Sequence, residues 1–300
     1  MFKITKHLKF ISIIFIAVLT LSTTYIIVNY NAKNRLENAK NNIITSDSVS
    51  LGNSDQLANS KGVVNNNYNR FENINLTSQN IGIPVLYYHS VDKNAANEVT
   101  IAPDVLEEQL NYIKDNNYIT ITMKELYEHI KNKEPIPEKS ILITFDDGYM
   151  NNYTEAFPIL KKLNMKATIF CVGNSLDGSY YLSEEAIKEM SDYGIDIESH
   201  TVNHVHLDTL SYDEQLLELK KSKEILEKIT GREVISLAYP FGDYNEDSIR
   251  AAKNAGYKLA FTTNLGLSDR EDNIYELDRI YISSHYDMNT FKSLLNNTKK

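Results

Sequence analysis

From Ile81 onward, short apolar runs rich in β-branched residues alternate with stretches whose apolar residues recur at helical spacing. This alternation predicts an α/β domain of strand–helix units around a parallel sheet, either open or closed into a barrel. In both architectures functional groups gather at the carboxyl ends of the strands. The predicted strands are 83–88, 118–121, 140–145, 167–172, 195–198, 234–239, 258–262 and 277–283. The predicted helices are 102–116, 123–131, 153–163, 183–193, 211–229, 246–255 and 288–295.

Composition and charge narrow the class of protein. A chain of 300 residues with 42% hydrophobic and 24% charged residues is typical of a globular protein with a sizeable core. The formal net charge of -9 argues against a nucleic-acid partner. The single cysteine, Cys171, excludes an intrachain disulfide and a cysteine-rich zinc site.

The amino-terminal part predicts export. Residues 10–32 carry no charge, and a run of roughly 20 apolar residues is enough to cross a bilayer. Lysines precede this run, so we expect residues 1–30 to be an uncleaved single-pass anchor whose start stays in the cytoplasm. Secretion after signal cleavage is the alternative. Residues 31–80 are rich in Asn and Ser and predict a disordered tether, which leaves residues 81–300 as a domain outside the cytoplasm.

An acid pair follows the predicted strand 140–145. Asp146 and Asp147 are followed by Gly148 and Tyr149. One interpretation is an acidic turn, since Asp-Gly is a common turn signal. The functional interpretation is that one carboxylate holds a metal while the other stays free as a base.

A histidine pair follows the predicted strand 195–198. His200 and His204 are four residues apart, so on a helical turn both imidazoles would share one face and could bind one divalent ion with an acid from elsewhere. Thr201 stands where the helical zinc-protease motif requires Glu, which disfavours that class. Two polar surface histidines are the alternative, because His206 also lies nearby.

Two further clusters end predicted strands. Tyr239, Pro240 and Phe241 are suited to wall a sugar-sized pocket, although ordinary loop packing is the commoner role. His89 follows the first strand and is suited to general acid or base chemistry, although a lone histidine there is more often structural.

Together these clusters resemble the polysaccharide deacetylases of carbohydrate esterase family 4, the NodB-homology domain. The resemblance rests on residues 144–149, 199–204 and 239–242 and covers roughly residues 81–295. It implies a distorted (β/α) barrel and a divalent metal, usually zinc, with Co²⁺, Ni²⁺ or Mn²⁺ as alternatives. It also implies that Asp147, His200 and His204 bind the metal and that Asp146 is the catalytic base.

The same resemblance implies the remaining roles. The Phe241 N–H would help to stabilise the oxyanion, a protonated histidine would donate to the leaving amine, and the substrate contacts would come from Tyr149, Tyr239, Pro240 and Phe241. The chain departs from the larger family in having Ala238 in place of a base-orienting Arg and no Trp. Residues 84–89 and 238–242 instead are similar to the poly-β-1,6-N-acetylglucosamine deacetylase subgroup, which makes His89 the expected general acid. His285 is held as the reserve acid, and Arg279 is a candidate to orient Asp146.

The sequence therefore predicts a membrane-anchored, metal-dependent N-deacetylase of an extracellular N-acetylglucosamine polymer. The alternatives are a peptidoglycan deacetylase, an O-acetyl sugar esterase and a glycan-binding pseudoenzyme. By analogy with the subgroup, a polysaccharide synthase in the membrane is a candidate partner. Residues 1–80 carry a formal charge of +4, which leaves -13 on the remainder, and such an acidic domain suits a neutral polymer that becomes cationic as acetyl groups leave.

Overall fold

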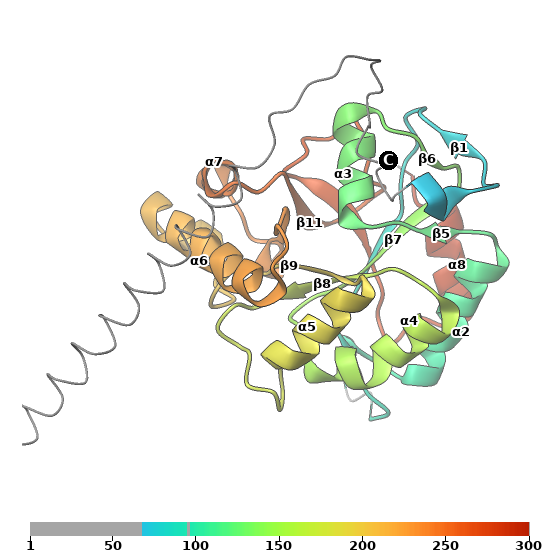
Figure 1. Cartoon of the computed structure of the whole chain (residues 1–300), viewed down its shortest axis with the longest axis horizontal. Helices are drawn as coiled ribbons and strands as arrows, with labels where there is room; N and C mark the ends of the chain where they lie inside the picture. The colour runs from blue at the N-terminus through green and yellow to red at the C-terminus, as the bar shows by residue number, and fades with distance from the viewer. Residues whose placement is uncertain (1–67, 95–96, 300) are drawn as a thin grey trace, which may run out of the picture. The chain divides into compact units, whose positions relative to one another are not determined.

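The computed structural model describes residues 68–94 and 97–299 (Figure 1). The predicted anchor at 1–30 and most of the predicted tether lie outside these residues. Within the described ranges, no helix is both long and apolar enough to cross a membrane.

Seven parallel strands form a closed barrel. Each strand pairs with the next in the order β2, β12, β11, β10, β9, β8 and β7, and pairing of β2 with β7 closes the ring (Figure 1). The structure thus selects the closed form of the predicted sheet, and β5 (Ile119–Thr120) extends it by pairing with the first residues of β7. The barrel strands are β2 (Val85–Tyr88), β7 (Ser140–Phe145), β8 (Thr168–Cys171), β9 (Asp196–Ser199), β10 (Ser236–Ala238), β11 (Leu259–Leu265) and β12 (Leu277–Tyr281).

In the described part of the chain, six α-helices lie between strands and a seventh follows the last strand, and Figure 1 shows them around the barrel. Local sequence signals set several of their ends: Ser211 and Glu214 form a capping box, and Gly194 and Gly231 are left-handed C-caps. The helices are α2 (Pro103–Asp115), α3 (Met123–Asn132), α4 (Phe157–Leu163), α5 (Glu184–Tyr193), α6 (Tyr212–Thr230), α7 (Glu246–Ala255) and α8 (Met288–Asn297).

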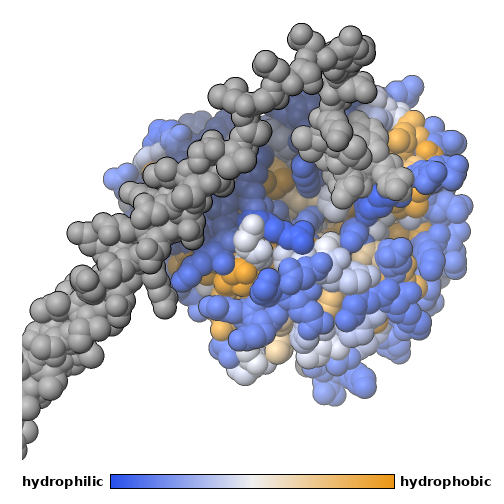
Figure 2. Space-filling view, viewed as in Figure 1, coloured by the Kyte–Doolittle hydropathy of each residue, from blue (hydrophilic) through white to orange (hydrophobic). Residues whose placement is uncertain are grey.

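Apolar side chains gather in two buried clusters. One lies between the barrel and its surrounding helices, and the other fills the barrel interior. Met123, Leu126 and Ile130 of α3 belong to the interior cluster, so α3 closes the amino-terminal end of the barrel. Figure 2 shows that the face of the domain turned toward the viewer is mostly hydrophilic, with small separate hydrophobic areas. Helix α3 leaves the other end of the barrel uncovered. That end holds the carboxyl ends of the strands, where functional groups gather in such barrels.

The folded part of the chain begins before the predicted boundary at Ile81. Strand β1 (Leu76–Thr77) pairs antiparallel with β6 (Ile136–Pro137). Arg70, in the short helix η1 (Tyr68–Phe71), pairs with Glu125 at 2.6 Å and donates to the Thr120 carbonyl at 2.8 Å. The predicted tether is thus wrong for residues 68–80, because their partners lie far away in sequence and composition alone does not reveal them.

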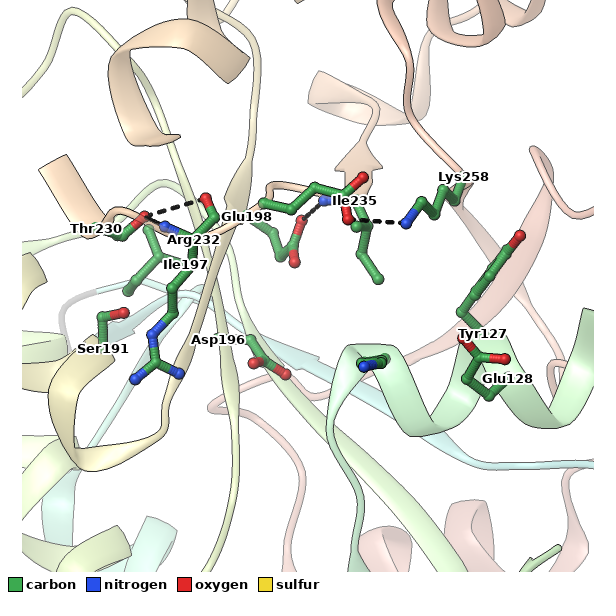
Figure 3. Close-up of a pocket in the computed structure, with 12 residues that line it drawn as sticks. Tyr127, Glu128, Ser191, Asp196, Ile197, Glu198, Thr230, Arg232, Ile235 and Lys258 are labelled. Carbon is green, nitrogen blue, oxygen red and sulfur yellow. Dashed lines mark hydrogen bonds and ion pairs between the residues drawn. The ribbon is translucent and has the colours of Figure 1, made fainter. Parts of the chain in front are cut away.

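A polar pocket of about 440 Å³ lies at the amino-terminal ends of β9 and β10, opposite the carboxyl ends of the strands. Asp196 and Glu198 extend into it from β9, and Arg232 and Ser191 also line it (Figure 3). Glu198 is buried and accepts hydrogen bonds from the backbone N–H groups of Ile235 and Ser236 at 2.8 and 2.7 Å. Burial, assisted by the Asp196 charge, raises the pKa of Glu198 well above its usual range.

Replacing this buried acid predicts a pH-dependent gain in stability. Because the pKa of Glu198 is higher in the folded than in the unfolded chain, wild-type stability falls as pH rises, by about 1.4 kcal/mol for each unit of difference. Glu198→Gln keeps a neutral acceptor for the two N–H groups and should unfold at higher urea than wild type at pH 8. At pH 4, just below the unfolded pKa of about 4.3, most of the unfolded chain also holds this proton, so the gain should largely disappear.

Urea titrations at the two pH values, with Glu224→Gln on the exposed face of α6 as control, test this expectation. A Gln variant whose gain is equal at pH 4 and pH 8, or that is destabilised at pH 8, would contradict it.

Candidate active site

The structure brings the predicted metal ligands together. Asp147 follows β7, and His200 and His204 follow β9. One ligand atom from each of the three lies within 4.8 Å of the others. The Asp147 Oδ1 is 3.4 Å from the His200 Nε2 and 3.2 Å from the His204 Nε2. Two imidazoles and one carboxylate in this arrangement suit a divalent transition metal.

The two histidines do not share a helical face, so that prediction is wrong. Residues 200–206 form a loop, in which Thr201 and His204 have φ of 65° and 53°. The His204 N–H donates to the Thr201 Oγ1 at 3.0 Å, and the two imidazole centroids lie 4.9 Å apart. A bent loop, rather than a helical turn, therefore brings the two imidazoles together.

Backbone strain is concentrated at this site. Besides Thr201 and His204, Asp147 and Phe241 are non-glycine residues with positive φ, 74° and 61°. Such conformations cost of order 1–3 kcal/mol each and persist where the surrounding structure enforces them, often at functional sites. All four residues belong to the motifs that follow β7, β9 and β10.

The tautomer of His200 fits metal binding. Its Nδ1 lies 2.8 Å from the Ala238 carbonyl oxygen, which can only accept, so Nδ1 carries the proton and donates it. Nε2 faces Asp147 and is the nitrogen that remains to bind a metal. Burial alone would raise the pKa of Asp147, but the hydrogen bonds from His200 and His204 outweigh it and hold that pKa below its usual range.

Asp146 is held by a buried arginine. The Arg279 Nη1 and Nη2 donate to Oδ1 and Oδ2 of Asp146, both at 2.8 Å, and their side chains are 0% and 4% exposed. Arg279 lies on β12, donates through Nε to the Thr262 carbonyl at 3.0 Å and stacks 4.1 Å from the Tyr87 ring centroid. Burial would raise the pKa of Asp146, but the Arg279 charge outweighs it and keeps the pKa below its usual range. Arg279 thus occupies the orienting position proposed for it.

His89 lies beside the acid pair, at the end of β2. Its Nδ1 is buried and has no hydrogen-bond partner among the described residues. Burial lowers the pKa of His89, while the charges of Asp146 and Asp147 partly offset this effect. His285, by contrast, is exposed on the turn after β12. The geometry therefore favours His89 over His285 as the acid.

The predicted substrate contacts separate into two groups. Tyr149 lies next to Asp147, and Phe241 is 53% exposed with its ring 4.5 Å from that of His204. Tyr239 is fully buried and donates from its hydroxyl to the Tyr275 carbonyl at 3.0 Å, and Pro240 is also buried. The prediction that Tyr239 and Pro240 wall a pocket is therefore wrong, because both side chains pack into the protein.

One group near the site was missed from sequence. Tyr180 and Tyr181, on the loop after β8, pack against Tyr149. With 20 tyrosines in the chain, residue type alone does not single them out. An aromatic pair on a loop that follows a barrel strand was the only available signal.

The fold and site together define a (β/α) barrel with a candidate metal centre at the carboxyl ends of its strands. The model of the polysaccharide deacetylase family matches residues 133–260. YxkH of Bacillus subtilis (strain 168), named as a polysaccharide deacetylase, is 36% identical over 217 residues, covering 72% of this chain and 77% of YxkH. The chain belongs to the polysaccharide deacetylase family, whose members are hydrolases.

Two further relatives bear on the site. The poly-β-1,6-N-acetyl-D-glucosamine N-deacetylase of Staphylococcus epidermidis is 29% identical over 200 residues, covering 62% of this chain and 68% of that enzyme. The structure of the Streptococcus pyogenes deacetylase PplD in complex with acetate superposes with a TM-score of 0.69 at 32% identity, covering 74% of this chain and all of that one. The barrel is therefore of the deacetylase type.

Proposed function

We propose that this protein is a divalent-metal-dependent N-deacetylase of an N-acetylglucosamine polymer, with poly-β-1,6-N-acetylglucosamine as the substrate. The observation that carries the proposal is the Asp147–His200–His204 cluster directly beside the buried Asp146–Arg279 pair. Such a site pairs a place for a Lewis acid with an ionised, oriented base.

Each group has a defined task in amide hydrolysis. Asp147, His200 and His204 would hold the metal, whose Lewis acidity polarises the acetyl carbonyl and makes water easier to deprotonate. Asp146 accepts a proton from the attacking water. Because Arg279 lowers its pKa, Asp146 stays ionised and can accept this proton.

The remaining groups handle the carbonyl oxygen and the leaving nitrogen. Phe241 lies against His204 and offers its backbone N–H to the developing oxyanion. His89, close to both aspartates, gives a proton to the departing amine. These roles use the residues that the barrel gathers from β2, β7, β9 and β10.

The choice of polymer rests on similarity. The subgroup patterns at residues 84–89 and 238–242 and the 29% identity to the Staphylococcus epidermidis enzyme support poly-β-1,6-N-acetylglucosamine. We propose zinc as the metal, a single membrane anchor at residues 1–30 with the catalytic domain outside the cell, and a polysaccharide synthase as membrane partner.

A substrate panel tests the function. The full chain, purified in detergent with zinc, should release acetate from β-1,6-linked N-acetylglucosamine oligomers faster than from cell-wall glycan strands or O-acetylated xylan. Preference for the glycan strands would indicate a peptidoglycan deacetylase, and preference for xylan would indicate an esterase. A metal-loaded protein that releases acetate from none of them would overturn the proposal in favour of a glycan-binding protein.

Removal of one ligand should abolish both metal binding and turnover. His204→Ala should lower metal affinity and kcat by about 100-fold or more, since even groups that only support a ligand are worth 10- to 100-fold in affinity. Metal content measured by mass spectrometry and acetate release check this. Glu224→Gln, on the exposed face of α6, is the control and should keep both. Full metal occupancy in His204→Ala would exclude it as a ligand.

A further inference from the structure

Three tyrosines form a compact aromatic cluster beside Asp147. The rings of Tyr149 and Tyr181 stack with centroids 5.5 Å apart and an interplanar angle of 12°. The Tyr180 ring meets both edge-on, at 5.3 Å from Tyr149 and 4.9 Å from Tyr181. Tyr149 comes two residues after Asp147 in the turn that follows β7, which places the cluster at the border of the metal ligands.

The cluster is held in place by its own loop. Tyr149 and Tyr181 form an antiparallel bridge, and the Met150 N–H donates to the Tyr180 carbonyl at 2.9 Å. The Asp177 Oδ1 accepts from the backbone N–H groups of Ser179, Tyr180 and Tyr181 at 2.8, 2.9 and 3.0 Å. A surface that is ordered before its ligand arrives loses little conformational entropy on binding.

Tyr180 nevertheless points an unusually large apolar surface to solvent. It is 63% exposed, among the highest values of any large hydrophobic side chain in the described part of the chain. A rigid aromatic ring left exposed beside a catalytic cluster is typical of a binding surface rather than of core packing.

A second aromatic surface lies on the other side of the metal ligands. Phe241 stacks on His206 with centroids 4.0 Å apart and an interplanar angle of 10°, and the His206 Nδ1 pairs with Asp243 at 2.7 Å. Phe241 follows β10, whereas the tyrosine cluster follows β8, and β9 with its two histidines lies between these strands. The reacting position is therefore flanked by aromatic rings in two directions.

We propose that Tyr180, supported by Tyr149 and Tyr181, is a binding subsite for a sugar residue adjacent to the one that is deacetylated. The inference rests on the proposed function, because it takes the ligand to be a neutral N-acetylglucosamine chain. The C–H face of a pyranose ring packs on an aromatic ring, and this ring contact is what Tyr180 offers. The enzyme then acts on residues inside a chain and prefers long oligomers.

Chain-length dependence tests the subsite. We compare kcat/KM for a β-1,6-linked N-acetylglucosamine pentamer with that for the dimer. Tyr180→Ala should lower the ratio of the two values about tenfold, mainly through KM for the pentamer, while Tyr180→Phe should preserve it because the ring is kept. Tyr193→Ala is the matched control: it removes a partly exposed tyrosine at the far end of α5 and should leave the ratio unchanged. An unchanged ratio in Tyr180→Ala, or a wild type without length preference, overturns the proposal.

A binding measurement separates this proposal from the proposed function. In the Asp146→Asn background, calorimetry should show that Tyr180→Ala weakens pentamer binding about tenfold and Tyr193→Ala does not. If no substrate releases acetate, the proposed function fails, yet this affinity difference still decides the subsite. If acetate is released but the affinity is unchanged, the subsite alone fails.

Discussion

Asp146→Asn is expected to lower kcat by about 10³- to 10⁴-fold while the protein keeps its metal, since a positioned general base contributes up to about this much. The substitution keeps the shape of the side chain but replaces the negatively charged carboxylate, which accepts the proton, with a neutral amide that is not basic. It leaves the cluster of Asp147, His200 and His204 intact. Acetate release at saturating oligomer, together with metal content, measures both halves of the expectation.

Comparison with His204→Ala distinguishes loss of the base from loss of a metal ligand. Loss of turnover with full metal content separates Asp146 from His204, whose removal should lose both. Because the variant also leaves Arg279 without its carboxylate partner, kcat is compared at a temperature where circular dichroism shows the variant to be folded. Near-wild-type kcat in a folded, metal-loaded variant would show that another group takes the proton.

Arg279→Met is expected to have the largest effect on stability. It leaves Asp146 as an uncompensated charge inside the barrel, and breaking a buried pair in this way costs about 3–5 kcal/mol. Activity should fall as well, because nothing then orients the base or holds its pKa low. Urea unfolding and acetate release at pH 7 measure the two effects.

The pH dependence of the loss follows from linkage. The pKa of Asp146 is lower in the folded than in the unfolded chain, so its contribution to stability is present above the unfolded pKa and is lost as pH falls through the folded one. The difference between wild type and Arg279→Met should therefore narrow as pH falls below about 4.

The matched control is the exposed pair of Arg250 and Asp247, which are 2.9 Å apart with side chains 58% and 42% exposed. Arg250→Met should cost only about 0–1 kcal/mol. If Arg279→Met and Arg250→Met lowered the free energy of unfolding equally, the buried pair would contribute no more to stability than the exposed one.

The positions of most candidate site residues were predictable from the order of strands and helices along the sequence. Strand–helix alternation placed Asp146, Asp147, His200 and His204 after strands, and parallel strands bring such residues to one edge. The structure puts the last three within reach of one ion. The prediction that the two histidines share a helical face was wrong. Thr201 and His204 adopt left-handed backbone conformations, which bend the segment into a loop.

The sequence by itself determined the class of fold and the chemistry available, because hydrophobic periodicity and residue type are local properties. Tertiary structure alone decided that the sheet closes through pairing of β2 with β7. This pairing brings Asp146, which follows β7, within reach of Arg279 on β12. The tertiary structure also determines that Tyr239 is buried, that Tyr180 is exposed and that residues 68–80 pack against the barrel domain. Each of these outcomes depends on contacts between residues far apart in the chain, which composition and periodicity do not encode.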